Sequence, residues 1–526
     1  MGEAKPYNNS NEYVFKNSGR GFAMRTILFL SDSVNRRTLQ LYDESGLYLP
    51  NLERLRRHSA VFDNHWTASA PCMPARRDIM TGRVNFLERG WGPIEPFDDT
   101  LPQLLRSGGV SSHIITDHYH YFEIGGENYC QMFDQWEFIR GQEWDPCLFP
   151  CKDCTPVHVG KMHPQYAKNR ELFYRTEENY PSAITIDKAA KWLCENHARD
   201  NFLLWIEPFD PHEPFEVPQK YLDRVEDDYE GPLYLWPEYA KTDGDKEKLC
   251  HIRRRYMALL LMTDEHLGNV LDSMDKYDMW DDTAFFYTTD HGYMLGEHAF
   301  LAKNYMPAYN EIFHIPLLVH LPGGAHEGER ISALTQNIDL LPTIMQLHKL
   351  ERPPQAHPIH GQSLLPLMDG SGKPREYILY GYFGKEINIT DGRYTYFRAP
   401  RNENKPLYMY TAVPIDNKVY FNRNRVTDIR EIEMGHFLSW TDYPLYRIPA
   451  QRIQNKPGYA LDYNYLLPWE KEDYLFDLQE DYAQDYNLVS ERPEIVVRMS
   501  CAMARELIRQ QAPRDHLERM GLMDHS

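Results

Sequence analysis

The chain has 526 residues, of which 42% are hydrophobic and 25% charged, as expected for a globular protein with two or more domains. Its formal net charge of −20 argues against a nucleic-acid-binding surface, although a metal ion and a few cations can still make one pocket attractive to an anionic substrate. No apolar run approaches the roughly 18 residues of a membrane span, so we expect no membrane association.

The first 23 residues are polar and rich in Gly and Asn, which predicts a flexible N-terminal extension. The apolar run Thr26 to Leu30 is too short for the core of a signal peptide and lacks a cleavage site after it, so we interpret it as a strand. With no export signal, we expect a cytoplasmic protein whose eight cysteines are free thiols.

Short apolar runs alternate with helix-like segments as far as residue 370. Strands are predicted at Thr26–Leu30, His113–Ile115, Phe202–Ile206, Ala284–Thr289 and Ile315–His320. Helices are predicted at Pro50–His58, Leu101–Ser107, Ala183–His197, His251–Tyr277 and Ile338–Leu347. This alternation indicates an α/β fold, with a mostly parallel sheet between two layers of helices.

Polar side chains follow four of the predicted strands, at the edge where ligands collect in such folds. These segments are 31–36, 116–120, 207–215 and 290–292.

The composition changes after about residue 370, where Ser371 to Pro374 has the character of a linker. Tyr-rich alternating segments follow, such as Tyr394 to Arg398, and a terminal helix is predicted from Pro493 to Gln511. We therefore predict a catalytic domain over 24–370 and a smaller α+β domain with an antiparallel sheet over 371–526.

Cys147, Cys151 and Cys154 have a CxxxCxxC spacing, and His158 follows them. A zinc or iron–sulfur site is one interpretation of this spacing. The segment lies mid-chain between Pro and aromatic residues, and no Gly-rich cofactor motif follows it. We favour a loop with free thiols.

Residues 70–83 read Ala-Pro-Cys-Met-Pro-Ala-Arg-Arg-Asp-Ile-Met-Thr-Gly-Arg. Pro74 suits the first turn of a helix, which places Cys72 at the helix N-terminus. Arg76, one turn further on, points back towards residue 72. Taken alone, the segment fits a small buried thiol at a helix start equally well.

The order Cys72, Pro74, Arg76 and Thr81-Gly82-Arg83 resembles the signature of the type I sulfatases, a formylglycine-dependent family of the alkaline phosphatase superfamily. The resemblance implies the alkaline-phosphatase-like fold. It also implies that a maturation enzyme oxidises Cys72 to formylglycine, whose hydrated aldehyde is the nucleophile. Further matches occur in order along the chain, at residues 26–36, 288–298, 337–343, 360–364 and 474–478.

The resemblance implies a divalent metal bound by Asp32, Asp290 and His291. Many sulfatases have a second Asp directly after the first, and this chain has Ser33 there. A hydroxyl, a carbonyl or water would then supply that ligand. Carboxylate ligands favour a hard cation, so we expect Ca²⁺, with Mg²⁺ or Mn²⁺ as alternatives, and His291 makes Mn²⁺ or Zn²⁺ less unusual.

The resemblance also gives roles to residues that would contact the substrate. Arg76 would hold the nucleophile together with the metal, Lys303 would bind sulfate oxygens, and His212 would contact the sulfate and protonate the leaving oxygen. The chain departs from the family at 116–120, where many sulfatases have Gly-Lys-Trp-His. The lysine is missing, and either His118 or His120 would replace the family histidine; we favour His120.

The combined features predict a hydrolase of sulfate monoesters, with a saccharide sulfate as the expected substrate. The alternative is a phosphonate monoester or phosphodiester hydrolase of the same superfamily, because those enzymes share the fold, the cysteine motif and an Asp-His metal pair. A catalytically dead binding or scaffold protein is disfavoured, since Cys72, Arg76, Asp290, His291 and Lys303 are all present.

Overall fold

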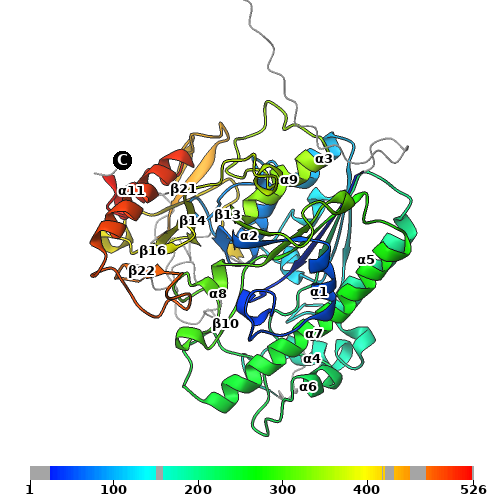
Figure 1. Ribbon diagram of the computed structural model, residues 1–526. Coiled ribbons are helices and arrows are strands. Elements are labelled where there is room, and N and C mark those ends of the chain that lie inside the picture. Colours follow the sequence, from blue (N-terminus) through cyan, green and yellow to red (C-terminus); the bar gives the residue numbers. More distant parts are fainter. Residues whose placement is uncertain (1–23, 150–157, 417–418, 421–431, 451–469, 524–526) are drawn as a thin grey trace, which may run out of the picture.

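The computed structural model describes residues 24–149, 158–416, 419–420, 432–450 and 470–523. An eight-stranded sheet lies at its centre, with strand order β13-β2-β12-β9-β1-β7-β4-β5 (Figure 1). Its strands in chain order are β1 (Arg25–Ser31), β2 (Ala60–Trp66), β4 (Ser111–Thr116), β5 (Gln135–Phe138), β7 (Phe202–Glu207), β9 (Thr283–Thr289), β12 (Leu317–His320) and β13 (Arg330–Gln336).

All of these strands run in one direction except β12, which is antiparallel to both β9 and β2. The sequence pattern predicted a strand here within a mostly parallel sheet, and β12 is the exception to the parallel direction. A parallel return needs a crossover, usually through a helix, and the only α-helix between β9 and β12 is the four-residue α8 (Asn310–Phe313). The chain therefore re-enters the sheet from the end at which β9 leaves it.

Helices cover both faces of the large sheet, as predicted. On one face α1 (Pro50–Arg57), α5 (Pro181–Asn196) and α7 (Lys246–Lys276) pack against strand residues such as Phe29 and Leu204. On the other, α2 (Cys72–Thr81), α3 (Leu101–Ser107) and α9 (Leu340–Leu347) pack against residues such as Leu28 and Leu203. Successive strand side chains point to opposite faces, so a continuously apolar strand serves both layers.

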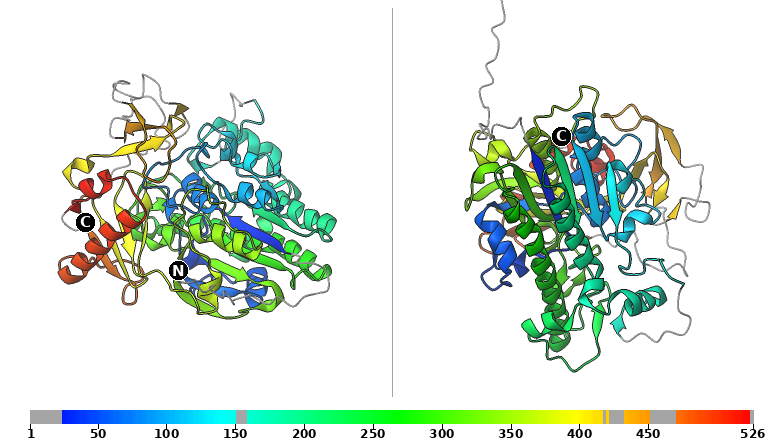
Figure 2. Two further views of the ribbon diagram at one scale, coloured as in Figure 1. Left: turned by 90° about the horizontal axis from the view of Figure 1, so that it is seen from above. Right: turned by 90° about the vertical axis from the view of Figure 1, so that its right-hand side faces the viewer.

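A second, five-stranded sheet has the order β22-β16-β15-β14-β3. Its strands are β3 (Ser69–Ala70), β14 (Ile378–Tyr382), β15 (Ile387–Thr390), β16 (Tyr394–Arg398) and β22 (Tyr474–Asp477). The pairs among β14, β15, β16 and β22 are antiparallel, as predicted, and α11 (Pro493–Arg509) packs on this sheet through Met499 and Met503. Figure 2 shows these C-terminal elements on one side of the molecule.

The strand β3 comes from the N-terminal part of the chain and pairs in parallel with β14. The residues directly before Cys72 therefore belong to the smaller sheet, and α2 begins where the two sheets approach each other. The division of the chain near residue 370 stays a prediction.

Six cysteines fall in the described part of the chain, and all six are free thiols. Cys147 donates a hydrogen bond from Sγ to Oδ1 of Asn169 over 3.7 Å. Cys151 and Cys154 lie outside the described residues, as does the N-terminal extension, so the expectations for both segments stay predictions. Within the described residues, no helix combines the length and apolarity that a membrane crossing requires.

Candidate active site

Cys72 is the first residue of α2 and directly follows the short connection from β3. The connection is fixed by Asp78, whose carboxylate accepts hydrogen bonds from the backbone N–H of Ser69 over 2.7 Å and of Asn85 over 2.9 Å. The helix ends at Gly82, where a left-handed φ of 66° favours glycine. Cys72 is 2% exposed, and the predicted position of this residue at a helix N-terminus is confirmed.

Three neighbouring strands, β9, β1 and β7, have an acidic residue at their carboxyl ends or directly after them. Ser31 of β1 pairs with Thr289 of β9, so Asp32 and Asp290 leave the sheet at the same level. Glu207 is the last residue of β7, on the other side of β1. Parallel strands bring their carboxyl ends to one edge, and this edge therefore gathers three buried carboxylates.

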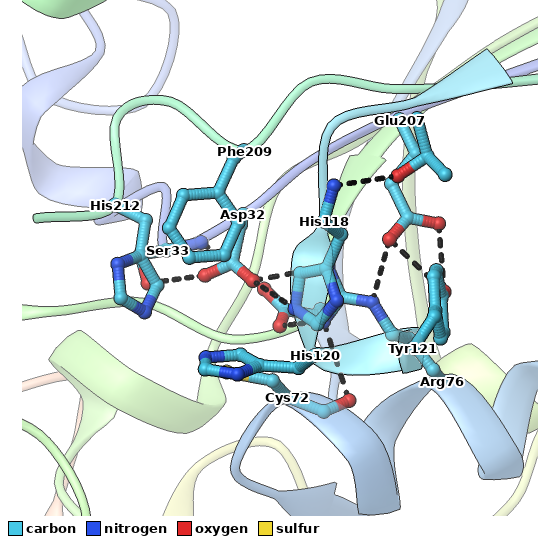
Figure 3. A network of polar contacts seen from close by, with 12 residues as sticks. Asp32, Ser33, Cys72, Arg76, His118, His120, Tyr121, Glu207, Phe209 and His212 are labelled. Atoms are coloured by element: carbon cyan, nitrogen blue, oxygen red, sulfur yellow. Dashed lines mark hydrogen bonds and ion pairs between the residues drawn. The ribbon is translucent and has the colours of Figure 1, made fainter. Parts of the chain in front are cut away.

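Arg76 connects α2 to all three carboxylates, and Figure 3 shows it near Asp32 and Glu207. Its Nε donates to Oε1 of Glu207 over 2.8 Å, Nη2 to Oδ2 of Asp32 over 3.0 Å, and Nη1 to Oδ2 of Asp290 over 2.5 Å. Burial opposes the charge of the guanidinium, but Glu207, Asp290 and Asp32 raise the pKa of Arg76 well above its usual value. Arg76 is therefore a buried permanent cation one helical turn after Cys72.

Four potential metal-ligating groups converge beside this cation. One ligand atom each from Asp32, Cys72, Asp290 and His291 can be chosen so that all lie within 4.8 Å of one another. Burial raises the pKa of Asp32, but Lys303, His212 and Arg76 outweigh this effect and hold the pKa well below its usual value. Asp32 is therefore ionised and suited to a hard cation.

The ring of His291 is oriented by the backbone of the next residue, Gly292. A carbonyl oxygen can only accept, so the 2.8 Å contact between Nδ1 of His291 and the Gly292 carbonyl places the proton on Nδ1. The other nitrogen, Nε2, then presents a lone pair 3.2 Å from Sγ of Cys72. Burial lowers the pKa of His291, which favours the neutral, metal-binding form.

Gly292 completes the Asp-His-Gly segment for a steric reason. A Cβ at this position would lie 1.8 Å from the carbonyl oxygen of Glu311. The close approach of the two backbones therefore requires glycine at this position.

Ser33 and Lys303 lie on the opposite side of Asp32 from Arg76. The Ser33 hydroxyl donates to Oδ1 of Asp32 over 2.6 Å, and its N–H donates to Oδ1 of Asp290 over 3.1 Å. Nζ of Lys303 donates to the Ser33 hydroxyl over 2.8 Å and lies 3.6 Å from Sγ of Cys72. In this arrangement Ser33 holds the carboxylates of Asp32 and Asp290, and Lys303 places a second buried cation beside Cys72.

Three histidines line the site, two of them after β4 and one after β7. Nε2 of His118 lies 3.5 Å from Oδ2 of Asp32, and neither ring nitrogen of His118 has a hydrogen-bond partner among the described residues. Nδ1 of His120 contacts Oε2 of Glu123 at 2.6 Å. Nδ1 of His212 donates to the backbone carbonyl of Glu213. Both candidates for the family histidine therefore lie in the site, His118 beside Asp32 and His120 beside His118.

Asp117, where many sulfatases have lysine, has a structural task. Its carboxylate accepts from the Gln142 side chain over 2.7 Å, from the Ser182 hydroxyl over 2.7 Å and from the N–H of Phe209 over 2.9 Å. The last contact anchors the loop that carries His212. Asp117 thus holds a wall of the site together, and burial raises its pKa to about 6.

Sequence reasoning missed two acidic residues, Glu207 and Glu143. Glu207 belongs to a strand end singled out for inspection, but no motif distinguishes it from a capping or surface acid. Oε2 of Glu207 accepts hydrogen bonds from Tyr121 over 2.9 Å and from Trp205 over 2.8 Å. These two bonds hold the carboxylate in position for its contact with Arg76. The detectable signal was its position at the end of a wholly apolar strand.

Comparison with known proteins agrees with this geometry. Residues 25–350 match the Sulfatase family model. The chain belongs to the sulfatase family. It is a sulfuric ester hydrolase with the alkaline-phosphatase-like fold that the sequence predicted.

Individual relatives are distant. The chain is 24% identical to a choline-sulfatase of Rhizobium meliloti over 413 residues, covering 70% of this chain and 77% of the relative. A solved protein bound to its substrate D-glucosamine-2-N,6-O-disulfate matches with a TM-score of 0.62 at 18% identity, over 93% of this chain and 98% of that one. The phosphonate monoester hydrolase of Agrobacterium radiobacter matches with a TM-score of 0.64 at 16% identity, over 94% and 97%.

The contact between Glu207 and Arg76 predicts a large effect of Glu207→Gln. The substitution leaves a buried guanidinium with one carboxylate fewer, so we expect the free energy of unfolding to fall by about 3 kcal/mol. Tyr121→Phe, which removes only hydrogen bonds to Glu207, is the matched control, with an expected loss of about 1 kcal/mol. Urea denaturation of the three proteins measures both values. Equal losses in the two variants would show that the ion pair between Glu207 and Arg76 contributes no more to the free energy of unfolding than the hydrogen bonds from Tyr121.

Proposed function

We propose that this chain hydrolyses sulfate monoesters of carbohydrates, using a formylglycine made from Cys72 by a maturation enzyme and one divalent cation, Ca²⁺ in the first instance. The observation that carries the proposal is the convergence on Cys72 of His291 at 3.2 Å and Lys303 at 3.6 Å, beside Arg76 and the carboxylates of Asp32 and Asp290. Such a site combines an anion-binding half with a metal-binding half around one reactive residue.

The surroundings of Cys72 favour conversion of the thiol over direct use of it. Burial raises the pKa of Cys72 well above its usual value, and Asp32 and Asp290 raise it further. The thiolate is the nucleophilic form of cysteine, so an unconverted Cys72 would be protonated and unreactive. A formylglycine at this position supplies a hydrated aldehyde, which can release bound sulfate by re-forming the carbonyl.

The donor set fits a divalent cation. Asp32 and Asp290 offer carboxylate oxygens, His291 offers Nε2, and residue 72 completes the group. Ser33 steadies both carboxylates and could add its hydroxyl oxygen. A bound cation would stabilise the ionised nucleophile and polarise the sulfate.

The remaining residues would bind the ester and assist its cleavage. Lys303 stays protonated, because Cys72, Asp32, Glu213 and Asp290 raise its pKa against the effect of burial, and its ammonium would pair with sulfate oxygens. His118, whose ring nitrogens have no hydrogen-bond partner among the described residues, would donate a hydrogen bond to the same group. His212 has its Nδ1 hydrogen committed to a carbonyl, which leaves Nε2 to protonate the leaving oxygen.

Formylglycine formation at Cys72 is tested by mass spectrometry and by mutation. Protein produced with a maturation enzyme should yield a peptide around residue 72 in which sulfur is replaced by oxygen, and Cys72→Ala should lower kcat at least about 1,000-fold by removing the nucleophile. The matched control is Cys130→Ala, which removes another buried thiol. Full activity with an intact thiol at residue 72 would contradict the proposal.

Metal dependence is measurable as ion content and as activity. We expect about one Ca²⁺ per chain by elemental analysis, loss of hydrolysis after chelation and recovery on adding the ion back. Asp290→Asn should weaken metal binding at least about tenfold, because it removes a charged ligand from the site. Asp272→Asn, on the solvent-exposed side of α7, should bind the ion like the wild type. Unchanged metal content in Asp290→Asn would rule out the assigned ligands.

The alternative activity, phosphonate monoester or phosphodiester hydrolysis, is favoured by the Asp290-His291 pair and by the fold match to a phosphonate monoester hydrolase. A panel of 4-nitrophenyl sulfate and 4-nitrophenyl phenylphosphonate separates the two. We expect kcat/KM to be at least about tenfold higher for the sulfate ester. Arg76, Lys303 and a bound metal ion would together stabilise the negative charge on the three terminal oxygens of its sulfate group. The reverse order would assign the chain to the phosphonate hydrolases.

A further inference from the structure

Glu143 lies between the two histidines of the substrate side of the site. Its Oε1 is 3.6 Å from Nδ1 of His212, and its Oε2 is 3.6 Å from Nε2 of His120. Oε2 also accepts a hydrogen bond from the Tyr119 hydroxyl over 2.8 Å. Glu143, His120 and His212 are each at least 99% buried, so solvent does not screen the charges among them.

The ring of His212 has a defined orientation. Its Nδ1 donates to the carbonyl of Glu213, and Oε2 of Glu213 lies 3.3 Å from the same nitrogen. With Oε1 of Glu143, three oxygens therefore face Nδ1, and Nε2 is the nitrogen left for the reacting group. Figure 3 shows the ring of His212 beside Ser33 and Asp32, at the reaction centre.

A proton on Nε2 of His212 needs negative charge near the ring. Burial lowers the pKa of His212 well below its usual value, and Lys303 lowers it further, whereas Asp32 and the Glu213 carbonyl raise it. The carboxylates of Glu143 and Glu213 both face the Nδ1 side of the ring, where they stabilise the imidazolium without occupying Nε2.

The position of Glu143 also favours a proton on His120. Nδ1 of His120 contacts a carboxylate oxygen of Glu123, which accepts, so this nitrogen carries hydrogen. Nε2 then faces Oε2 of Glu143, and two bare lone pairs would repel in a buried site. Protonation of His120 at Nε2 would replace this repulsion with an ion pair to Glu143, which also faces His212.

A metal ion is a poorer explanation of these three residues. One ligand atom from each of His120, Glu143 and His212 can be chosen within 4.8 Å of the others. The His212 nitrogen that faces Glu143 is however the one that donates to a carbonyl, so its lone pair is not available there. Glu143 thus lies at ion-pair distance from both rings, and the hydrogen bonds that hold these groups come from Tyr119, Glu123 and the Glu213 carbonyl.

We propose that Glu143 is a positioning residue for protonation of the leaving oxygen. It fixes His212 with Nε2 towards the ester and stabilises the imidazolium form. As the bond between sulfur and the ester oxygen breaks, its electron pair stays on that oxygen, which takes the proton from Nε2. The sulfuryl group passes to the nucleophile at residue 72. This inference rests on the proposed role of His212 in sulfate ester hydrolysis.

The test compares two leaving groups in Glu143→Gln. A sugar alkoxide needs the proton, whereas 4-nitrophenolate is stable without it. We expect kcat/KM for a monosaccharide 6-sulfate to fall about 100-fold, the usual contribution of a general acid, and that for 4-nitrophenyl sulfate to fall less than about tenfold. The matched control is Glu216→Gln, which removes a neighbouring buried carboxylate that pairs with Arg170. In this control variant, the ratio of kcat/KM for the sugar sulfate to kcat/KM for 4-nitrophenyl sulfate should equal that of the wild type.

Equal losses on both esters, or no loss on the sugar sulfate, would overturn the role of Glu143. If Glu143→Gln does not fold, Tyr119→Phe removes the hydrogen bond to Oε2 and should shift the ester ratio in the same direction by a smaller factor. An unchanged ratio in that variant would equally count against the proposal. Hydrolysis of 4-nitrophenyl sulfate does not need the proton. Loss of this activity in Cys72→Ala therefore tests the proposed function separately from the role of Glu143.

Discussion

The buried guanidinium of Arg76 is the contact on which the site depends. It bonds to Asp290, Asp32 and Glu207, which come from three adjacent strands of the large sheet. Because Cys72 lies one turn earlier on the same helix, these bonds also set the distance between residue 72 and the sheet edge. A buried cation is stable only with carboxylates around it, so the helix and the three strand ends require one another.

The site has two halves of different charge. Around residue 72, Arg76 and Lys303 accompany the carboxylates, and a divalent cation there would make this half attractive to an anionic ester. Around His212, the carboxylates of Glu143 and Glu213 face the ring. The first half suits the sulfate and the nucleophile, and the second suits a proton donor. An overall charge of −20 is therefore compatible with an anionic substrate.

Several residues had to be seen in three dimensions before their roles could be assigned. Asp117 stands where many sulfatases have lysine, and it anchors the loop of His212 through Phe209. Glu207 and Glu143 match no motif, yet one fixes Arg76 and the other lies between two histidines. The direction of β12 and the pairing of β3 with β14 were equally hidden. Periodicity reports which face of an element is buried, but it carries no information on loop paths or on long-range partners.

The sequence by itself determined the fold class, the apolar strands and their polar ends, and the helix that begins at Cys72. These features are local, because hydrophobic period, proline position and short motifs act within a few residues of the chain. Only the tertiary structure decided which acids meet Arg76, where His118 and His120 lie, and how His212 is oriented. Those contacts join residues that are tens to hundreds of positions apart, and their geometry follows from strand register and from the packing of α2 against the sheet edge.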